Sequence, residues 1–397
     1  MNRVFDSNII EQNATIDHVK ALAFNRSTSS VGETRAALYI QDELRKKNIE
    51  STMEYFSFNG PKRIFMRLSY FIIFSYLIIN RLILILALYF AIKYLFATTR
   101  NLSLVEKEDS KNLIAKISAR KEQEKGGLII FSAHYDNFSA NIPYRMQSVL
   151  FFIFRIIIAP FILIILTLSM WFLIELFSSN PDTEEIYELV VTYSIIEFLI
   201  VFFILLLIYN TKKSSGSIDN ASGVSILIEL IKSLKTNPLE NYDIIFLWSG
   251  AEEWGVIGSR CFYKRHLKEL EKEYDLNISF NINIDMVGTY IGLLNARKFQ
   301  NKKFKYNLTQ VIEDSAKKLG ISIEKYQKII NPTSDYKSFM SFAKKTKSLF
   351  QVSCFHSEKD SKYIHSQRDT PDKCSSKVLN DCFEICYKVI KTFDANF

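Results

Sequence analysis

The sequence is poor in cysteine, and the few cysteines that it has form no recognisable framework. There are five, an odd number, and their spacing fits neither a disulfide scaffold nor a structural zinc module. Cys382 and Cys386 are four residues apart in a predicted helix, so they can share one face of it. The simplest interpretation of all five is free thiols, buried or half-buried, in a reducing compartment.

Two further signals are missing. Residues 1–20 contain no apolar core, so we expect no cleavable signal peptide. The chain also lacks helix-turn-helix, zinc-finger and RNA-binding signatures. The net charge of +8 therefore does not indicate a nucleic-acid partner, and many of the lysines and arginines instead flank apolar runs.

Long apolar runs are present, and they interrupt an otherwise polar pattern. The first apolar block covers residues 64–97 and the second covers residues 148–209. Within the second block, residues 156–177 and 187–209 are each long enough to cross a ~30 Å hydrocarbon core, which takes ~20 helical residues. The first block fits either two short spans that turn near Asn80 or one long tilted span. We favour the hairpin, because the strands on either side of it must join one sheet.

These blocks predict a multi-pass integral membrane protein with the lipid bilayer as a partner. One soluble domain would be assembled from residues 1–61, 101–144 and 212–397 and interrupted by membrane insertions at 62–100 and 145–211. Basic residues gather at the ends of the spans, whereas the tip at 178–185 (SSNPDTEE) has none. The positive-inside rule then places the soluble domain on the cytoplasmic side.

The soluble parts alternate helices and strands, which is typical of an α/β fold. The predicted strands are 50–58, 112–118, 128–136, 243–253 and 280–288. The predicted helices are 10–27, 31–48, 222–235, 256–273, 308–319, 335–344 and 376–393. The last three strands are apolar and end in acid or histidine, which is how an open α/β sheet presents a site at its strand ends.

Residues of metal-ligand type lie at these strand ends or in the following loops. They occur in five segments: HYD (134–136), DNASG (219–223), EE (252–253), NIDMVG (283–288) and YIHSQRDTPD (363–372). Histidine and carboxylate together suit zinc. A carboxylate can also bridge two metals, because it has two oxygens. Taken singly, each motif has an ordinary alternative, such as a helix cap, a solvated acid pair or a buried ion pair.

Six motifs together resemble those of the aminopeptidase Y and bacterial leucine aminopeptidase family of dizinc exopeptidases. They are HYD, DNASG, GAEEWGVIGS, NIDMVG, SDYKSFM and YIHSQRDTPD, in the family order. The resemblance covers roughly residues 10–60, 110–138 and 214–392. It implies the zinc-exopeptidase (phosphorylase/hydrolase-like) fold, a mixed α/β sheet flanked by helices. The transmembrane helical insertions would interrupt that fold.

The resemblance implies two zinc ions. His134 and Asp285 would bind one ion, Glu253 and His365 would bind the other, and Asp219 would bridge both.

Catalytic roles follow from the same resemblance. Glu252 would be the general base for a zinc-activated water. Asp136 would hydrogen-bond and orient the imidazole of His134. The peptide bond between Asp219 and Asn220 would be cis. Tyr336 departs from the histidine that usually follows Ser-Asp in this family, which leaves one contact to the substrate in question.

The expected function is therefore that of a membrane-bound metallo-exopeptidase, most simply an aminopeptidase acting on peptide N-termini. One alternative is a glutaminyl cyclase-like acyltransferase, although cyclases of this fold use one zinc. A second is a non-catalytic membrane scaffold, although no ligand is lost here. A third is a dizinc amidase or carboxypeptidase, which the motifs separate poorly from an aminopeptidase.

Overall fold

The computed structural model describes residues 13–58, 107–121, 124–144, 213–294, 306–327 and 333–397, with single positions between 146 and 203. The chain divides into two compact units. Unit 1 comprises Met1–Phe58, Asp109–Ser139 and Lys212–Phe397, and unit 2 comprises Asn59–Glu108 and Ala140–Thr211. In unit 2, exposed large apolar side chains include Met146, Val149, Phe152, Ile153, Ile156, Ile195, Ile196, Leu199, Phe202 and Phe203.

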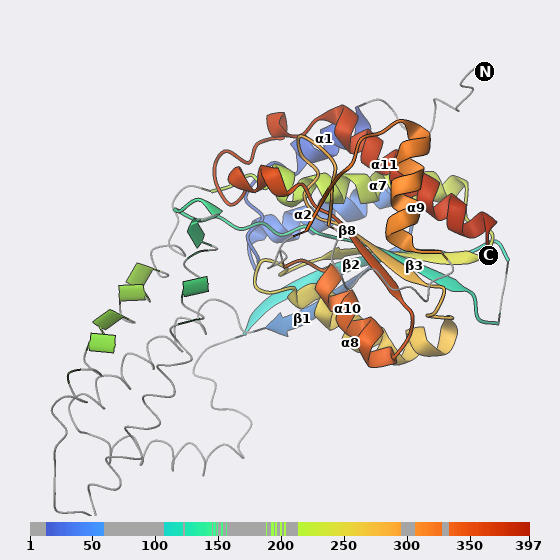
Figure 1. Ribbon diagram of the computed structural model, residues 1–397, viewed down its shortest axis with the longest axis horizontal. Helices are drawn as coiled ribbons and strands as arrows, with labels where there is room; N and C mark the ends of the chain where they lie inside the picture. Colours follow the sequence, from blue (N-terminus) through green and yellow to red (C-terminus); the bar gives the residue numbers. More distant parts are fainter. Residues whose placement is uncertain are drawn as a thin grey trace, which may run out of the picture. The chain divides into compact units, whose positions relative to one another are not determined.

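A mixed sheet forms the centre of unit 1 (Figure 1). It has eight strands, in the order β1-β2-β4-β3-β5-β8-β6-β7. The strands are β1 (Ser51–Phe58), β2 (Glu108–Ile117), β3 (Gly127–His134), β4 (Tyr242–Ser249), β5 (Phe280–Ile284), β6 (Gly292–Leu294), β7 (Glu324–Tyr326) and β8 (Gln351–Phe355). Strands β4, β3, β5 and β8 run parallel to one another, whereas β2 and β6 are antiparallel to their neighbours β4 and β8. The four parallel strands therefore end at one edge of the sheet.

Both faces of the central strands are buried, which explains their continuous apolar runs. In the register of β3 and β4, Ile130 pairs with Ile245 and Phe131 pairs with Phe246. Successive side chains of a strand point to opposite faces. The two isoleucines therefore face one helical layer, and the two phenylalanine rings, which stack at 5.4 Å, face the other.

Helices cover both faces of the sheet (Figure 1). One layer contains α1 (Ala14–Ala21), α2 (Val31–Arg45), α7 (Ser222–Thr236), α9 (Leu308–Leu319) and α11 (Ser376–Ala395). The other contains α8 (Ile257–Glu273) and α10 (Tyr336–Thr346). Helix α7 lies directly on β3 and contacts α1, α2 and α11, so it is the central helix of its layer.

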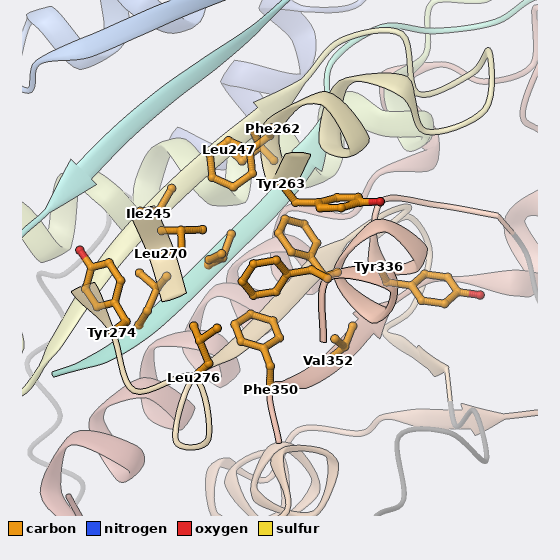
Figure 2. Packing of buried hydrophobic residues seen from close by; sticks show 14 of the residues in the cluster. Ile245, Leu247, Phe262, Tyr263, Leu270, Tyr274, Leu276, Tyr336, Phe350 and Val352 are labelled. Atoms are coloured by element: carbon orange, nitrogen blue, oxygen red, sulfur yellow. The ribbon is translucent and has the colours of Figure 1, made fainter. Parts of the chain in front are cut away.

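The layer between the sheet and helices α8 and α10 is rich in aromatic side chains (Figure 2). Phe342 of α10 packs edge-on against Phe350 at 5.1 Å and lies 6.4 Å from the Tyr263 ring of α8. Full burial of such a side chain contributes about 1.5–3 kcal/mol. This packing fixes α10 against β5 and β8, and so fixes the residues that precede α10.

Most predicted elements are present, but the strands end earlier than predicted. Strand β3 ends at His134, β4 at Ser249 and β5 at Ile284, so the acidic residues that follow lie in loops. The pairing of β1 with β2 is confirmed, as is the mixed α/β sheet flanked by helices. The sequence did not predict β6, β7 or β8. All five cysteines are free, and four of them are buried.

The prediction of a multi-pass integral membrane protein with a cytoplasmic catalytic domain is contradicted. No helix in the described ranges is both long enough and apolar enough to cross a membrane. Helix α11 has 20 residues but is amphipathic. Its charged residues are Lys377, Asp381, Glu384, Lys388, Lys391 and Asp394. The predicted spans at 64–97, 156–177 and 187–209 lie outside the described residues, apart from single positions.

Candidate metal centre

The candidate ligands converge because they follow neighbouring parallel strands. His134 is the last residue of β3, Asp285 directly follows β5, and Glu253 lies in the loop after β4. Asp219 lies in the short η1 segment (Ser217–Ala221) that leads into α7. His365 lies in the loop that follows η3 (Glu358–Lys362). Five residues that are far apart in the sequence thus meet at one edge of the sheet.

The Asp219 carboxylate lies between two imidazoles. Its Oδ1 is 3.1 Å from His134 Nε2, and its Oδ2 is 3.3 Å from His365 Nε2. Each oxygen thus faces a different histidine, which is the arrangement that a bridging ligand needs.

Each histidine also faces a second carboxylate. Asp285 Oδ1 is 3.3 Å from His134 Nε2, and Glu253 Oε2 is 3.2 Å from His365 Nε2. The structure therefore groups the five residues into two half-sites that share Asp219. This is the pairing that the sequence resemblance implies, and the ligand roles themselves stay a prediction.

The geometry of the donor atoms fits zinc. Ligand atoms ~2.1 Å from a tetrahedral zinc ion lie ~3.4 Å from one another. The nitrogen–oxygen separations here, 3.1 to 3.3 Å, are close to that value. Three possible ligand atoms, one from each of His134, Asp219 and Glu253, lie within 4.8 Å of one another. Glu253 Oε1 is buried and has no hydrogen-bond partner among the described residues, so it has an acceptor free for a cation.

The charges at the centre also favour a bound cation, since buried acids outnumber the imidazoles. Burial raises the pKa of Glu252 well above its ordinary value, and the charges of Glu253 and Asp285 add to the shift. Burial alone would lower the pKa of His365, but Glu253 and Asp219 raise it to about 10. Burial likewise opposes the shift at His134, yet the Glu252 charge and the neighbouring carboxylates of Asp136, Asp219 and Asp285 raise its pKa well above normal. Buried like charges of this kind are costly unless a cation compensates them.

Asp136 acts on two neighbouring segments. The Nδ1 atom of His134 is 3.1 Å from the backbone carbonyl of Asp136, whereas the nearest carboxylate oxygen is 3.6 Å away. The imidazole can therefore donate Nδ1–H to that carbonyl and present Nε2 to the centre. The Asp136 carboxylate instead accepts hydrogen bonds from the backbone N–H groups of Glu252 and Glu253 and from the Thr28 hydroxyl. It thus holds the loop that carries the predicted base, a role that the sequence did not reveal.

Asn220 ties the Asp219 segment to the Asp285 segment. Its Nδ2 donates to the Ile284 carbonyl at 2.9 Å, and its Oδ1 accepts from the N–H groups of Gly223 and Met286. The peptide bond between Asp219 and Asn220 is cis, as the resemblance implied. The Asn-Ala-Ser-Gly part of the motif therefore connects the two segments that carry Asp219 and Asp285.

Several backbone positions at the centre are in the left-handed region. They include His365 (φ 56°), Ala251 just before Glu252 (φ 54°) and Met286 just after Asp285 (φ 68°). Such residues cost about 1–3 kcal/mol each and concentrate at functional sites. Here the packed loops hold the ligands and the predicted base in these conformations.

The residues before α10 lie beside the centre. Ser249 Oγ donates to the Asp335 carboxylate, and Asn283 Nδ2 donates to Ser334 Oγ at 2.7 Å. Tyr336, which departs from the family pattern, is 2% exposed and belongs to the aromatic core beneath the sheet (Figure 2). Its ring therefore contributes to packing.

Two aromatic side chains flank the centre. The Phe138 ring meets the His365 ring edge-on at 5.2 Å, and the Trp254 ring meets the Phe138 ring edge-on at 5.9 Å. Phe138 and Trp254 are half-buried. The only sequence signal for this aromatic pair is its position beside the HYD and EE motifs.

Comparison with known proteins shows similarity to a peptidase family and to aminopeptidases. Residues 207–390 match the family described as Peptidase family M28, a range that contains Asp219, Glu253, Asp285 and His365. Aminopeptidase YwaD of Bacillus subtilis (strain 168) is 42% identical over 76 residues. That stretch covers 19% of this chain and only 16% of the relative.

Solved structures are similar in fold at low sequence identity. The aminopeptidase from Aneurinibacillus sp. strain AM-1 has a TM-score of 0.57 at 14% identity and covers 96% of this chain and 93% of its own. A glutaminyl cyclase from an Acidobacteriales bacterium also has a TM-score of 0.57, at 13% identity, with 100% of both chains covered. Together, the family match and the relatives support a zinc metallopeptidase with a zinc aminopeptidase-like fold.

Proposed function

We propose that this chain is a dizinc aminopeptidase that removes N-terminal residues from peptides. One observation carries the proposal: the two oxygens of Asp219 face two histidines, each paired with a further carboxylate. His134 and Asp285 would hold one zinc ion, and Glu253 and His365 the other.

Glu252 is the proposed general base. When bound, the zinc pair supplies a water of lowered pKa and polarises the scissile carbonyl. The Glu252 carboxyl is buried, and its backbone N–H is held by Asp136 at 3.1 Å. The charges of His134, Glu253 and Asp285 act on this carboxyl. From this place Glu252 can take a proton from water and return it to the leaving amine.

The arginine beside the centre bears on which substrate terminus would bind. Two zinc ions would balance the four carboxylates of Asp219, Glu252, Glu253 and Asp285, so the preference for an α-amine rests on this arginine and not on net charge. Among the described residues, Arg26 is a cation whose charge interacts with Asp219 and Glu253. Its guanidinium donates to backbone carbonyls, so it is not free to bind a C-terminal carboxylate.

An assay of the purified full chain tests the function. We expect release of the N-terminal residue from peptides with a free amine, no release from N-acetylated versions of the same peptides, and loss of activity with chelator. Cleavage of the N-acetylated peptides at an equal rate would refute the aminopeptidase assignment. The glutaminyl cyclases that share the fold define a second outcome. Ammonia release from an N-terminal glutamine without peptide-bond cleavage would indicate a cyclase.

A further inference from the structure

The bridging residue Asp219 ends a backbone segment that is held by two buried charged side chains. This segment, residues 214–219, follows the long stretch 140–213. On one side of it lies Arg26, whose side chain is 0% exposed. Arg26 Nη1 donates to the Ser215 carbonyl and Nη2 donates to the Gly216 carbonyl, both at 2.8 Å. The first half of the segment is therefore fixed by a cation through its carbonyl oxygens.

On the other side of the segment lies Asp369, which is also 0% exposed. Its Oδ1 accepts from the Ile218 N–H at 2.6 Å, and its Oδ2 accepts from the Asp219 N–H at 3.3 Å. The Ser215 hydroxyl donates to its backbone carbonyl. The second half of the segment is therefore fixed by a carboxyl group through its amide groups. Burial raises the pKa of Asp369 to about 7, and the two N–H donors oppose that rise because they stabilise its anionic form.

The two charges compensate each other across the segment. Within the described part of the chain, Arg26 forms no ion pair within 4.0 Å. Burial lowers its pKa to about 10, and the charge of Asp369 opposes that shift. An isolated buried charge is strongly unfavourable, and hydrogen bonds to charged groups are about twice as strong as neutral ones. The hydrogen bonds with the peptide groups between them therefore stabilise the buried side chains of Arg26 and Asp369.

Arg26 also connects this segment to the other half of the centre. Its Nε donates to the carbonyl of Tyr135, the residue after His134, at 2.8 Å. Its backbone N–H donates to Asn137 Oδ1, and Asn137 Nδ2 donates to the Ser214 carbonyl. A single guanidinium thus links the end of β3 to the segment that leads to Asp219.

Gly216 packs tightly against the side chains of Asn137 and Arg26. It has φ 62°, in the left-handed region, and a Cβ atom there would lie 2.6 to 2.8 Å from atoms of Asn137 and Arg26. Any side chain at this position would push the segment away from the guanidinium.

We propose that Arg26 and Asp369 are positioning residues for the bridging ligand. Together they fix residues 214–219 so that the Asp219 carboxylate spans His134 and His365, and they thereby set the zinc affinity of the centre. The inference rests on the proposed function. Neither side chain contacts the Asp219 carboxylate, so each acts through the backbone.

Zinc affinity of the full-length protein is the test, measured by competition with a chromogenic chelator. Arg26→Gln and Asp369→Asn each remove one charge while keeping a polar side chain. We expect the zinc affinity of each to fall about 10- to 100-fold, the range typical when groups that support metal ligands are lost. The visible spectrum of the cobalt-loaded variants should also change, because it reports the geometry around the metal.

Lys232→Gln is the matched control. Lys232 is another mostly buried cation, bonded to Glu43 at 2.9 Å and Glu229 at 3.0 Å. It lies ten residues beyond Ser222 on α7, about 15 Å along the helix. Its loss should lower the unfolding temperature of the metal-free protein and leave the zinc affinity and the cobalt spectrum unchanged.

Wild-type zinc affinity and an unchanged cobalt spectrum in folded Arg26→Gln and Asp369→Asn would overturn the inference. An equal loss of affinity in Lys232→Gln would do so too, since the effect would then be general destabilisation. If Arg26→Gln does not fold, Arg26→Lys and Asp369→Asn decide, and wild-type affinity in both refutes the positioning role. Wild-type protein that binds no zinc overturns the proposed function and this inference with it.

Discussion

Gly223 is the position where a single added methyl group should disturb the centre most directly. It lies in the first turn of α7, and a Cβ atom there would approach the Ile284 carbonyl and the Asn220 side chain closer than 3.0 Å. Neither neighbour can yield easily. The carbonyl belongs to the backbone just before Asp285, and Asn220 is bonded to that carbonyl and to the Gly223 N–H.

The expected effect of Gly223→Ala can be worked out from these contacts. Replacing glycine by alanine inside a helix alone stabilises by about 0.5–1 kcal/mol. Overpacking costs about 1–3 kcal/mol, and loss of the two Asn220 hydrogen bonds costs about 1 kcal/mol each. The net destabilisation is therefore about 2–4.5 kcal/mol. Because α7 would move away from the Asp285 loop, zinc affinity should fall as well.

Thermal unfolding of the metal-free protein and a zinc titration measure both effects. Gly320→Ala is the control, because Gly320 has φ 71° at the end of α9 and no atom lies within 4 Å of its added Cβ. It should cost about 1–2 kcal/mol from backbone strain alone and leave zinc affinity unchanged. A Gly223→Ala protein that is at least as stable as the wild type, with unchanged zinc affinity, would refute the argument from close packing.

Other predictions concern the base, the aromatic flank and acid stability. Glu252→Gln should lower kcat by at least the ~10²-fold typical of a lost general base. Its zinc content, measured by elemental analysis, should stay at the wild-type level, whereas Glu253→Gln should lose zinc. The opposite result would exchange the two roles. Phe138→Ala and Trp254→Ala should raise KM for peptides more than they lower kcat, with zinc content unchanged; equal KM values would show that the aromatic pair does not meet the substrate. Burial alone would raise the pKa of Glu43, but two lysines lower it from the ordinary 4.5 to about 2. The Glu43 carboxylate therefore stabilises the fold above about pH 4.5, and this contribution disappears as the pH falls towards 2. Unfolding temperatures of the wild type and Glu43→Gln should therefore differ at pH 6 and converge near pH 2, and a constant difference would contradict this.

The sequence predicted the strand-end residues of the site well, for a physical reason. Each motif is local, and an apolar strand followed directly by a histidine or an acid is visible without knowledge of the fold. His134 ends one buried parallel strand and Asp285 directly follows another, although both strands were predicted to run further. Parallel strands then bring them to one edge, so topology converts separate motifs into one centre.

The residues that support the ligands could not be predicted in the same way. Arg26 lies in a loop, and nothing in its neighbourhood shows that it will be buried against carbonyls nearly 190 residues away. Asp369 lies in the YIHSQRDTPD motif, but nothing in that motif shows that its carboxylate will hold the backbone N–H groups of Ile218 and Asp219. Strand β8 was missed because QVSCF alternates polar and apolar residues over only five positions, although all five are buried.

The membrane prediction failed for a different reason. It rested on the length of the apolar runs at 64–97, 156–177 and 187–209. None of the helices in the described part of the chain is long and apolar enough to cross a membrane. Helix α11, the longest of the described helices, is amphipathic and packs against α7 and α9.

The hydrogen bond between the Ser214 N–H and Ser139 Oγ, at 2.8 Å, has a consequence for how this chain tolerates change. It holds the two ends of the stretch 140–213 next to each other, just outside the backbone that carries His134 and Asp219. Ser139 and Ser214 both belong to unit 1, whereas residues 140–211 belong to unit 2. A change within residues 140–211 that leaves Ser139 and Ser214 in place should therefore keep this hydrogen bond, and with it the backbone next to His134 and Asp219.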